Sequence, residues 1–557
     1  MAEYDHITDV AVVGSGGGGL VSALVAKFEG LDSIVLEKTK YYGGSTAMSG
    51  GGIWIPNNHF MVKTGIPDSY EKALTYLKLI VGDRVPEARL EAYVRHAPEA
   101  LKYLEDKASL LYCIVPGYSD YYAELPGGTV EGRGLEPIPF DGRKLGDNLK
   151  TLKNLPYSIP GGISVTICEY CQLSRVKTTT KGKLAALKFG AGFIKNRLLG
   201  VERLTMGRAL IGRLRYSLMK HNIPLWLDSP AKRLLTENGR VVGVEILKNG
   251  TPFAIQARKG VVLAAGGFAR NLEMRKKYQR HPISVDWTCA NEGNTGDAIN
   301  MGMEIGAAID LMDDAWWGSS SLLPNGQAMF HVSERALPGT IIVNSAGRRF
   351  CNEAVPYTDW GHYVYEANSS EASTIPCYYI MDQRARNNYM FGLAMPGRLP
   401  KDFIETGYVK RANTIRELAL QCGINPAGLA DTIEKLRVYA QDGKDEEYGK
   451  GETTYDRFYG DPTVKPNPCL APIEKPPYYA VELFPGDLGT KGGLVTDEHA
   501  RVLRSDGSVI DGLFSTGNNS ASVMGNTYAG PGGTIGPAIT FSYVAAMYMA
   551  HNSIITD

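Results

Sequence analysis

The sequence predicts an α/β fold in which a Rossmann-like nucleotide-binding domain is interrupted by an inserted α+β cap. Two observations lead to this prediction. Over residues 9–37, a strand, a glycine-rich turn, a helix and a second strand follow one another, which is the pattern of a dinucleotide-binding unit. Glycine-rich motifs return between 486 and 536, whereas residues from about 310 to 485 have none. Motifs at both ends with a plain middle indicate an insertion.

The domain boundaries follow from this pattern. We expect the nucleotide-binding domain to comprise residues 1–313 and 487–557, and the catalytic cap to comprise residues 314–486. The length of 557 residues would allow three or four domains of about 100–200 residues each. We favour two or three, because large nucleotide-binding enzymes often fold as fewer, larger domains.

The composition excludes several classes of protein. Lys+Arg and Asp+Glu both number 59, which argues against a wide nucleic-acid interface, so no nucleic-acid partner is expected. The N-terminus lacks the basic start and apolar stretch of a secretory signal, and no run of about 18 apolar residues occurs. The eight cysteines are scattered, which suits free thiols in a reducing compartment. The pair Cys168 and Cys171 has no further ligand at metal spacing, so no metal is expected. The free thiols and the lack of a signal indicate a cytoplasmic protein.

The expected elements of the nucleotide-binding domain begin with a short apolar run from Asp9 to Val13, which suits a buried parallel strand. A helix is expected from about Gly18 to Glu29, and a second strand over Ser33–Leu36. Residues 60–108 alternate helical patterns with breaks. Residues 109–165 are irregular and rich in Gly, Pro and Tyr, as active-site loops often are.

Two further regions of this domain can be placed. A strand-like block at Gly239–Leu247 leads into a second one, which ends in Ala264-Ala265-Gly266-Gly267. Near the C-terminus, a helix is expected from about Thr534 onward.

The glycine-rich turn fits G-x-G-x-x-G from Gly14 to Gly19, between a strand and a helix. Its glycines permit a tight turn, close approach of a pyrophosphate, and helix–strand packing, and the helix N-terminus offers free N–H groups. Glu37 follows at the end of the second strand, where a carboxylate can bind an adenosine ribose. The turn alone is a weak signal, and Glu37 strengthens it.

A second glycine-rich run indicates which dinucleotide is bound. Lys38 to Gly52 is rich in glycine and hydroxyl side chains, which exceeds what NAD alone would need. Together with Ala264 to Gly267 and with Ser515 to Asn518, this run favours FAD. The candidate cofactor-binding residues are Gly14, Ser15, Gly16, Gly17, Gly18, Gly19, Glu37, Lys38, Gly43, Gly44, Ser45, Thr46, Ser49, Gly50, Gly51, Gly52, Ala231, Ala265, Gly266, Gly267, Asn294, Asp297, Gly517, Asn518, Gly533, Thr534 and Ile535.

Residues 172–203 form a basic apolar stretch, with eight Lys or Arg side chains, one acid, and interleaved Leu, Ile and Phe. Two interpretations are open. Such a stretch can lie on an anionic membrane surface, giving peripheral membrane contact. It can equally be an ordinary helix with a solvated basic face.

These motifs resemble the fumarate reductase and succinate dehydrogenase flavoproteins, and more closely the 3-ketosteroid Δ1-dehydrogenases. The resemblance covers nearly the whole chain. Its specific segments are Gly51 to Pro56, Asp120 to Tyr122, Gly207 to Gly212, Asn352 to Tyr357, Asp487 to Leu494, and Tyr528 to Gly532.

The resemblance implies roles for particular residues. In that family a tyrosine hydroxyl and a glycine N–H hold the steroid C3 carbonyl, which corresponds here to Tyr528 and Gly532. Donors at this position stabilise the enolate that develops when C2 loses a proton. A second tyrosine, matched by Tyr357, takes the C2 proton with help from another, matched by Tyr121, and the C1 hydride goes to flavin N5. Tyr118, one helical turn from Tyr121, could replace it as the helper.

Tyr118 and Tyr122 are the further candidates for substrate contact. The expected partner is therefore a steroid or sterol. The sequence leaves the electron acceptor open between a quinone and an artificial acceptor.

The sequence also departs from its relatives in three places. The His and Arg set that binds dicarboxylates in fumarate-reducing members cannot be placed, although Arg348, Arg349 and His362 occur. Ser45 stands where those enzymes often link FAD to a histidine, so non-covalent FAD is expected. Residues 150–205 are longer than in typical members, which resembles a branch that acts on sterols such as cholest-4-en-3-one.

Three alternatives remain. A 3-ketosteroid Δ4-(5α)-dehydrogenase and a fumarate reductase-like flavoprotein share the flavin domain. A flavin electron-transfer subunit would be no enzyme at all.

Overall fold

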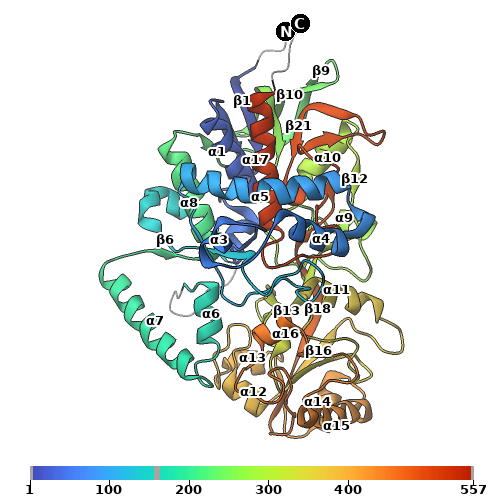
Figure 1. Ribbon diagram of the computed structural model, residues 1–557. Coiled ribbons are helices and arrows are strands. Elements are labelled where there is room, and N and C mark those ends of the chain that lie inside the picture. The colour runs from blue at the N-terminus through green and yellow to red at the C-terminus, as the bar shows by residue number, and fades with distance from the viewer. Residues whose placement is uncertain (1–3, 156–163, 553–557) are drawn as a thin grey trace.

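The structure, a computed structural model, describes residues 4–155 and 164–552 (Figure 1). Its upper part is built on an eight-stranded sheet whose main path runs β20-β21-β11-β1-β2-β8. The strands of this path are β1 (His6–Val13), β2 (Ser33–Leu36), β8 (Leu225–Trp226), β11 (Thr251–Leu263), β20 (Arg501–Leu503) and β21 (Val509–Ser515). β1 pairs in parallel with β2 and β11, and β11 pairs in parallel with β21, which confirms the predicted α/β arrangement.

This sheet is buried on both faces, as the apolar sequence of its central strand requires. Side chains alternate along β1, so Val10 and Val12 pack with α1 (Gly17–Phe28), whereas Ala11 and Val13 pack with the opposite side. β9 (Ala231–Glu237), β10 (Arg240–Lys248) and α10 (Asp297–Glu304) contribute to that second cluster. The strand-like block predicted at 239–247 is therefore β10, and it pairs antiparallel with β11.

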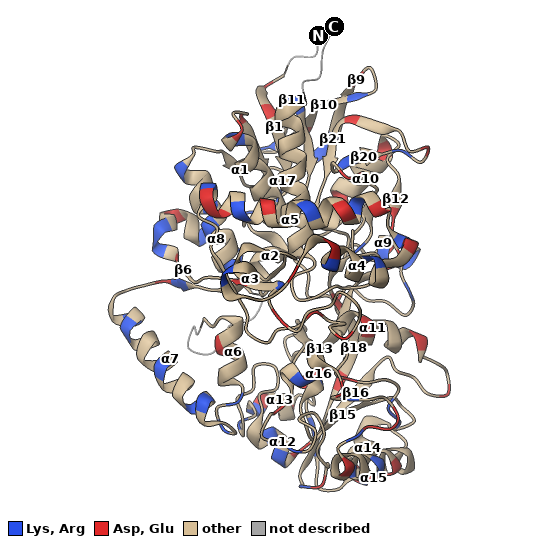
Figure 2. Cartoon of the chain, viewed as in Figure 1, with Lys and Arg blue, Asp and Glu red and all other residues tan. Residues whose placement is uncertain are grey.

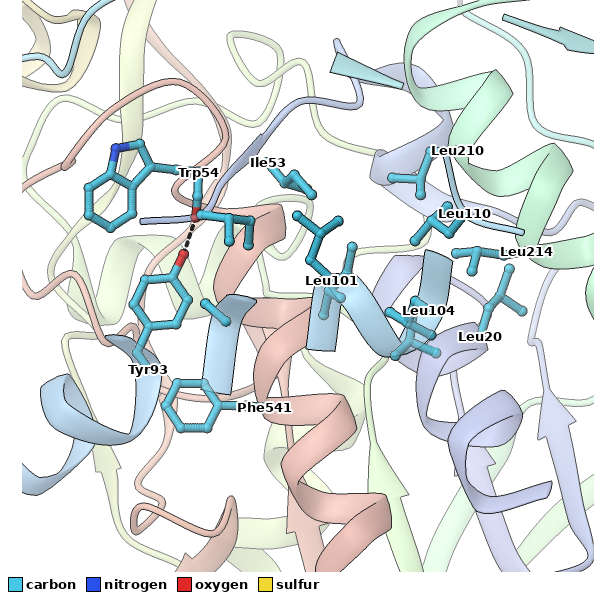
Figure 3. Close-up of a cluster of buried hydrophobic side chains, with 14 of the residues drawn as sticks. Leu20, Ile53, Trp54, Tyr93, Leu101, Leu104, Leu110, Leu210, Leu214 and Phe541 are labelled. Carbon is cyan, nitrogen blue, oxygen red and sulfur yellow. Dashed lines mark hydrogen bonds between the residues drawn. The ribbon is translucent and has the colours of Figure 1, made fainter. Parts of the chain in front are cut away.

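The helical side of the sheet carries the largest core. α17 (Ile535–His551) packs against α1 and against α5 (Glu87–Ala108), and α8 (Met206–Lys220) lies against α1. The predicted start of the last helix near Thr534 is confirmed to within one residue. Figure 3 shows this cluster, where the Tyr93 hydroxyl donates to the carbonyl of Trp54. The labelled side chains are Leu20, Ile53, Trp54, Tyr93, Leu101, Leu104, Leu110, Leu210, Leu214 and Phe541.

The lower part of the molecule has its own sheet, in the order β14-β13-β18-β16-β15 with β17 beside β18. Its strands are β13 (Ala315–Leu322), β14 (Ala328–His331), β15 (Thr340–Val343), β16 (Cys377–Asp382), β17 (Lys410–Ala412) and β18 (Tyr478–Thr490). Around it lie α11 (Tyr357–Glu366), α12 (Gln383–Asn388), α13 (Lys401–Glu405), α14 (Ile415–Cys422), α15 (Pro426–Asp442) and α16 (Thr454–Tyr459). β18 runs without a break through residues 486 and 487, so the second boundary expected from the sequence lies within a strand.

Shorter elements lie in the connections between these strands. They are α2 (Gly44–Met48), β3 (Ile53–Trp54), α3 (His59–Thr64), α4 (Tyr70–Val81), β4 (Tyr112–Ile114), β5 (Gly134–Pro137), β6 (Phe140–Asp141), β7 (Arg203–Leu204), α9 (Leu272–Tyr278), β12 (Ile309–Asp310) and β19 (Gly493–Leu494). Short 3-10 segments occur at Gly82–Arg84, Gly142–Thr151, Glu334–Ala336 and Gly517–Asn519.

A helical extension leaves the body of the molecule at its side (Figure 1). It consists of α6 (Ile167–Leu173) and α7 (Thr180–Leu198), and within α7 only Gly182 is buried. In Figure 2 several Lys and Arg positions, coloured blue, lie along α7. No helix in the described part of the chain is both long enough and apolar enough to cross a membrane.

Candidate functional site

The turn between β1 and α1 can be built only from glycine at its two ends. Gly14 has φ +107°, and a Cβ there would lie 2.4 Å from the carbonyl oxygen of Ala264. A Cβ on Gly19 would lie 2.0 Å from the carbonyl oxygen of Gly14. Both distances are impossible for real atoms, so these glycines let β1, α1 and the end of β11 approach one another.

Other glycines of the motifs face open space. A Cβ on Gly16 would come no closer than 3.7 Å to another atom, and one on Gly44 no closer than 3.9 Å, where it would meet Gly16. Gly50 and Gly517 are similarly open. The two glycine-rich runs therefore lie side by side and leave room for a ligand against bare backbone. This fits an elongated dinucleotide such as FAD.

Glu37 lies at the end of β2 and contacts the turn directly. One of its carboxylate oxygens accepts from Ser15, at 2.5 Å from the hydroxyl and 3.2 Å from the backbone N–H. The other oxygen accepts from the N–H of Thr39 at 2.9 Å. This places the carboxylate beside the turn, where the sequence predicts a ribose contact.

The hydroxyl-rich run after β2 connects to segments far away in the sequence. The Thr46 hydroxyl accepts from the N–H of Gly17, the first residue of α1, at 3.2 Å. The Ser45 hydroxyl accepts from the N–H of Asn291 and from the Asn294 amide, both at 3.0 Å.

Lys38 and Asp297 form an ion pair with 2.7 Å between Nζ and Oδ2. Both were predicted to contact the cofactor. Their charges compensate each other in this structure.

The remaining predicted cofactor residues occupy the same end of the sheet. Ala231 begins β9, two residues after Ser229, whose N–H donates to the Glu37 carbonyl at 2.9 Å. Asn518 follows β21 and accepts from the Trp316 indole at 3.2 Å. The others lie in or next to four elements. Gly18 lies in α1, Gly43 precedes α2, and α2 is followed by Ser49, Gly51 and Gly52. The strand β11 is followed by Ala265, Gly266 and Gly267, and α17 begins after Gly533 and Thr534, at Ile535.

Three tyrosines predicted to be catalytic meet in one buried cluster. The rings of Tyr357 and Tyr528 are 5.3 Å apart between centroids, those of Tyr121 and Tyr528 are 5.1 Å apart, and those of Tyr121 and Tyr357 are 5.8 Å apart. All three pairs are edge-to-face. Tyr357 is the first residue of α11, whereas Tyr121 and Tyr528 lie in loops joined by the hydrogen bond from the Tyr121 N–H to the Ala529 carbonyl.

Gly532 completes this cluster. It has φ +94°, and a Cβ there would lie 2.4 Å from the Cα of Ile53, so only glycine fits. Burial raises the pKa of Tyr528, and hydrogen bonds with Thr534, Tyr357 and the Gly532 backbone act in the opposite direction. The Tyr528 phenol and the Gly532 backbone therefore lie close together.

Burial also dominates the acidity of Tyr357. It raises the pKa of Tyr357 well above its usual value near 10, and the neighbouring Tyr528 raises it further. The hydrogen bond with Tyr121 acts in the opposite direction. Tyr121 is thus the neighbour that makes Tyr357 more acidic.

The two other predicted tyrosines have different partners. The Tyr118 hydroxyl lies 2.6 Å from that of Tyr459, and its ring stacks on Phe458 at 4.5 Å. The Tyr122 hydroxyl lies 2.9 Å from Asp359 Oδ1. Substrate contact by either residue stays a prediction, and neither ring is among the three that meet edge to face.

Sequence reasoning missed several aromatic residues of this region. Tyr455 packs on Tyr121 at 4.7 Å, Trp316 packs on Tyr528 at 4.7 Å, and Phe330 packs on Tyr357 at 5.4 Å. Tyr455 and Tyr459 are four residues apart in α16, a spacing that places both on one side of a helix. That spacing is the one local signal that the sequence offered.

Within the described residues no metal cluster occurs, and Arg349 and His362 have internal partners. Across residues 4–155 and 164–552, no three His, Cys, Asp or Glu side chains are grouped to hold a metal. Burial raises the pKa of Cys171 to about 11, so this thiol stays protonated at neutral pH. Arg349 is buried between Glu353 and Asp445, and His362 contacts Asp314 at 2.8 Å, so both are occupied by internal carboxylates.

Comparison with known proteins identifies the family of this chain. A family model described as FAD binding domain matches residues 9–535. A 3-oxosteroid 1-dehydrogenase of Mycobacterium tuberculosis is 46% identical over 552 residues, which cover 97% of this chain and 98% of that protein.

Two solved structures are also similar. The 3-ketosteroid delta1-dehydrogenase from Sterolibacterium denitrificans, in complex with 1,4-androstadiene-3,17-dione, superimposes with a TM-score of 0.94 at 42% identity, covering 98% of this chain and 99% of that one. The 3-ketosteroid-delta4-(5alpha)-dehydrogenase from Rhodococcus jostii has a TM-score of 0.67 at 22% identity, over 99% of this chain and 98% of that one, which is a likeness of fold alone. The chain therefore belongs to the FAD-binding flavoproteins and, within them, to the 3-ketosteroid Δ1-dehydrogenase family.

Proposed function

We propose that this chain introduces the C1–C2 double bond into 3-ketosteroids, with the buried cluster of Tyr121, Tyr357, Tyr528 and Gly532 as its active centre. The observation that carries the proposal is the convergence of these four residues from three distant parts of the chain. The relative from Sterolibacterium denitrificans holds a steroid with a double bond at C1, which is the product that this reaction would give.

The Tyr528 hydroxyl and the Gly532 N–H would bind the C3 carbonyl oxygen. Negative charge develops on that oxygen when C2 loses a proton, so donors fixed in advance stabilise the transition state more than the substrate. Each such donor typically contributes about 2.7–4 kcal/mol. The rigid backbone at Gly532, wedged against Ile53, suits a fixed donor.

Tyr357 would accept the C2 proton. Its raised pKa makes the phenolate scarce at neutral pH, and the hydrogen bond with Tyr121 partly compensates by stabilising that phenolate. The rings of Phe330, Trp316 and Tyr455 pack around the three tyrosines and would keep water away from the proton transfer.

The glycine-rich runs at 14–19 and 43–52, with Glu37 and the segment 533–535, would hold FAD, which supplies the acceptor for the C1 hydride. Ser45 has no group that forms a stable bond to a flavin, which supports non-covalent binding. Acid precipitation should then leave the yellow colour in the supernatant.

Phenol-to-phenyl variants test the proposal. Tyr528→Phe and Tyr357→Phe should each retain FAD and lose at least about a hundredfold in kcat, because each removes a donor or base used only in the transition state. Turnover of androst-4-ene-3,17-dione with an artificial acceptor measures this. Tyr389→Phe is the matched control, since Tyr389 is buried and donates to Asp461 at 2.8 Å elsewhere in the cap.

The outcomes separate the alternatives. Wild-type rates in both tyrosine variants would remove these residues from the mechanism. With a 5α-saturated 3-ketosteroid as substrate, a new double bond at C4 would identify a Δ4-(5α)-dehydrogenase. Oxidation of reduced methyl viologen by fumarate would identify a fumarate reductase.

We further propose that α7 contacts an anionic membrane and gives access to sterols that keep their side chain. Leu184, Leu187, Ile194 and Leu198 recur at helical spacing and are all exposed, with Leu198 at 81%. The helix contains five Lys or Arg residues and no acid. An apolar stripe flanked by cations is the pattern of a helix that lies in a membrane interface.

A further inference from the structure

Each of the three tyrosine-bearing segments carries a second polar side chain close to its tyrosine. Tyr122 follows Tyr121, Asp359 lies two residues after Tyr357, and Thr527 precedes Tyr528. These three neighbours meet: the Tyr122 hydroxyl donates to Asp359, at 2.9 Å from Oδ1 and 3.0 Å from Oδ2, and accepts from the Thr527 hydroxyl at 3.1 Å. One phenol thus bridges the loop of Tyr121, the helix of Tyr357 and the loop of Tyr528.

A buried lysine fixes one side of this bridge. The Lys491 ammonium donates to the Thr527 carbonyl at 3.0 Å and lies 3.1 Å from Asp314 Oδ2. It also lies 4.9 Å from the ring centre of Trp316, which in turn packs on Tyr528. Lys491 is fully buried, so its charge is held in place by these contacts and not by water.

The hydroxyl of Tyr122 is already committed to the protein. A phenol has a single O–H donor, and here it points to the Asp359 carboxylate. It has no second proton with which to bind a steroid ketone. This argues for a role different from the substrate contact that the sequence suggested for Tyr122.

We propose that Tyr122, Asp359 and Thr527 are positioning residues that form a hydrogen-bonded clamp, anchored by Lys491, which fixes the mutual placement of Tyr121, Tyr357 and Tyr528. The clamp acts on the reaction only through those three phenols. This inference rests on the proposed function of the tyrosine cluster and adds the groups that hold it in its reactive arrangement.

Tyr122→Phe is the decisive variant, because it keeps the ring and removes both hydrogen bonds. It should bind FAD and unfold at the wild-type temperature, yet kcat should fall by about tenfold or more, since a misplacement of about 1 Å can cost about a hundredfold. KM for androst-4-ene-3,17-dione should change by less than about twofold. Tyr389→Phe, which loses an equally buried phenol–carboxylate bond, should keep the wild-type kcat.

Companion variants identify the clamp as the cause. Asp359→Asn keeps an oxygen that accepts from Tyr122 and should retain most of kcat, whereas Asp359→Leu should not. Thr527→Val removes one donor and should lower kcat less than Tyr122→Phe does. The double variant Tyr122→Phe/Thr527→Val should match Tyr122→Phe alone, because both changes act on the same hydroxyl.

Each contrary result has a definite meaning. A wild-type kcat in Tyr122→Phe would overturn the clamp and leave the Δ1 reaction in place. A raised KM with unchanged kcat would make Tyr122 a substrate contact and overturn the clamp as well. If Tyr122→Phe fails to hold FAD, Thr527→Val becomes the test of the clamp. An unchanged kcat in Thr527→Val would then reject it. A wild-type enzyme that forms no 1-ene product would reject the proposed function, and the clamp would fall with it.

Discussion

At the scale of single residues, the site depends on how burial changes the chemistry of phenols. Tyr121, Tyr357 and Tyr528 lie in one apolar cluster, where burial raises the pKa of each. This suits the proposed role of Tyr528 as carbonyl donor, because a neutral phenol keeps the proton that it donates. For the base Tyr357 it is a cost, which the hydrogen bond with Tyr121 reduces.

The pH dependence of turnover should report this balance. In the proposed mechanism Tyr357 acts as the phenolate, and below its pKa the phenolate fraction falls about tenfold per pH unit. Because the pKa is raised, log kcat should climb with pH and reach no plateau below about 10. Tyr121→Phe removes the bond that lowers this pKa, so the rising limb should shift to higher pH and kcat at pH 8 should fall. Rate profiles from pH 6 to 10 test this, and an unshifted limb in Tyr121→Phe would contradict it.

The sequence predicted some residues of the site far better than others, for a physical reason. Gly14, Gly19 and Glu37 are required by the geometry of one turn, and their spacing can be read from the sequence. Tyr455 contacts the cluster because of the way the cap packs, and nothing local distinguishes it from the other tyrosines among the 31 in the chain. Tyr357 and Tyr528 could be selected because of a family resemblance, and no spacing rule would have chosen them.

At the scale of elements, the β1–α1–β2 unit was predictable and the cap sheet was not. The unit has an apolar strand, a glycine turn and a periodic helix, each with its own signal. In β13, Ser319, Ser320 and Ser321 are fully buried, which a search for apolar strands would miss. Their hydroxyls bond to distant groups, such as the carbonyls of His331 and Trp287, so only the folded sheet explains them.

The tight turn of the β1–α1–β2 unit makes a direct prediction. A methyl group on Gly19 would lie 2.0 Å from the Gly14 carbonyl oxygen, so Gly19→Ala must push α1 away from β1. We expect this variant to lose FAD, measured by the flavin absorbance of the purified protein. Gly190→Ala in α7 is the control, since no atom lies within 4 Å of its added methyl group. Full flavin content in Gly19→Ala would show that the turn tolerates the shift.

At the scale of the whole molecule, the proposed active centre is assembled from segments of both the upper and the lower part. Tyr121 and Tyr528 lie in loops attached to the upper part, and Tyr357 begins a helix that packs on the lower sheet. The clamp around Tyr122 crosses the same junction. The α6–α7 extension leaves the body next to this junction, with Arg175 bonded to the carbonyl of Phe458, the residue that stacks on Tyr118. A membrane-bound α7 would therefore stand near the substrate site.

This arrangement predicts that membrane binding and sterol turnover depend on α7 together. Deleting 175–203 should abolish co-sedimentation with vesicles that contain phosphatidylserine. A milder triple variant, Leu187→Ser/Ile194→Ser/Leu198→Ser, alters only exposed side chains and should lose binding without loss of FAD. Lys183→Gln/Lys188→Gln/Lys195→Gln should weaken binding to anionic vesicles by about 1 kcal/mol per lysine, and should have less effect in high salt.

The loss of membrane binding should affect turnover of a membrane-delivered sterol but not of a dissolved steroid. Cholest-4-en-3-one delivered in vesicles should react more slowly in all three variants, whereas dissolved androst-4-ene-3,17-dione should react at the wild-type rate. Leu420→Ser, which changes an exposed leucine on α14 at 62% exposure, is the control. Unchanged vesicle binding after deletion of 175–203 would leave α7 as an ordinary solvated helix, because neither its apolar stripe nor its lysines would then be needed at a membrane.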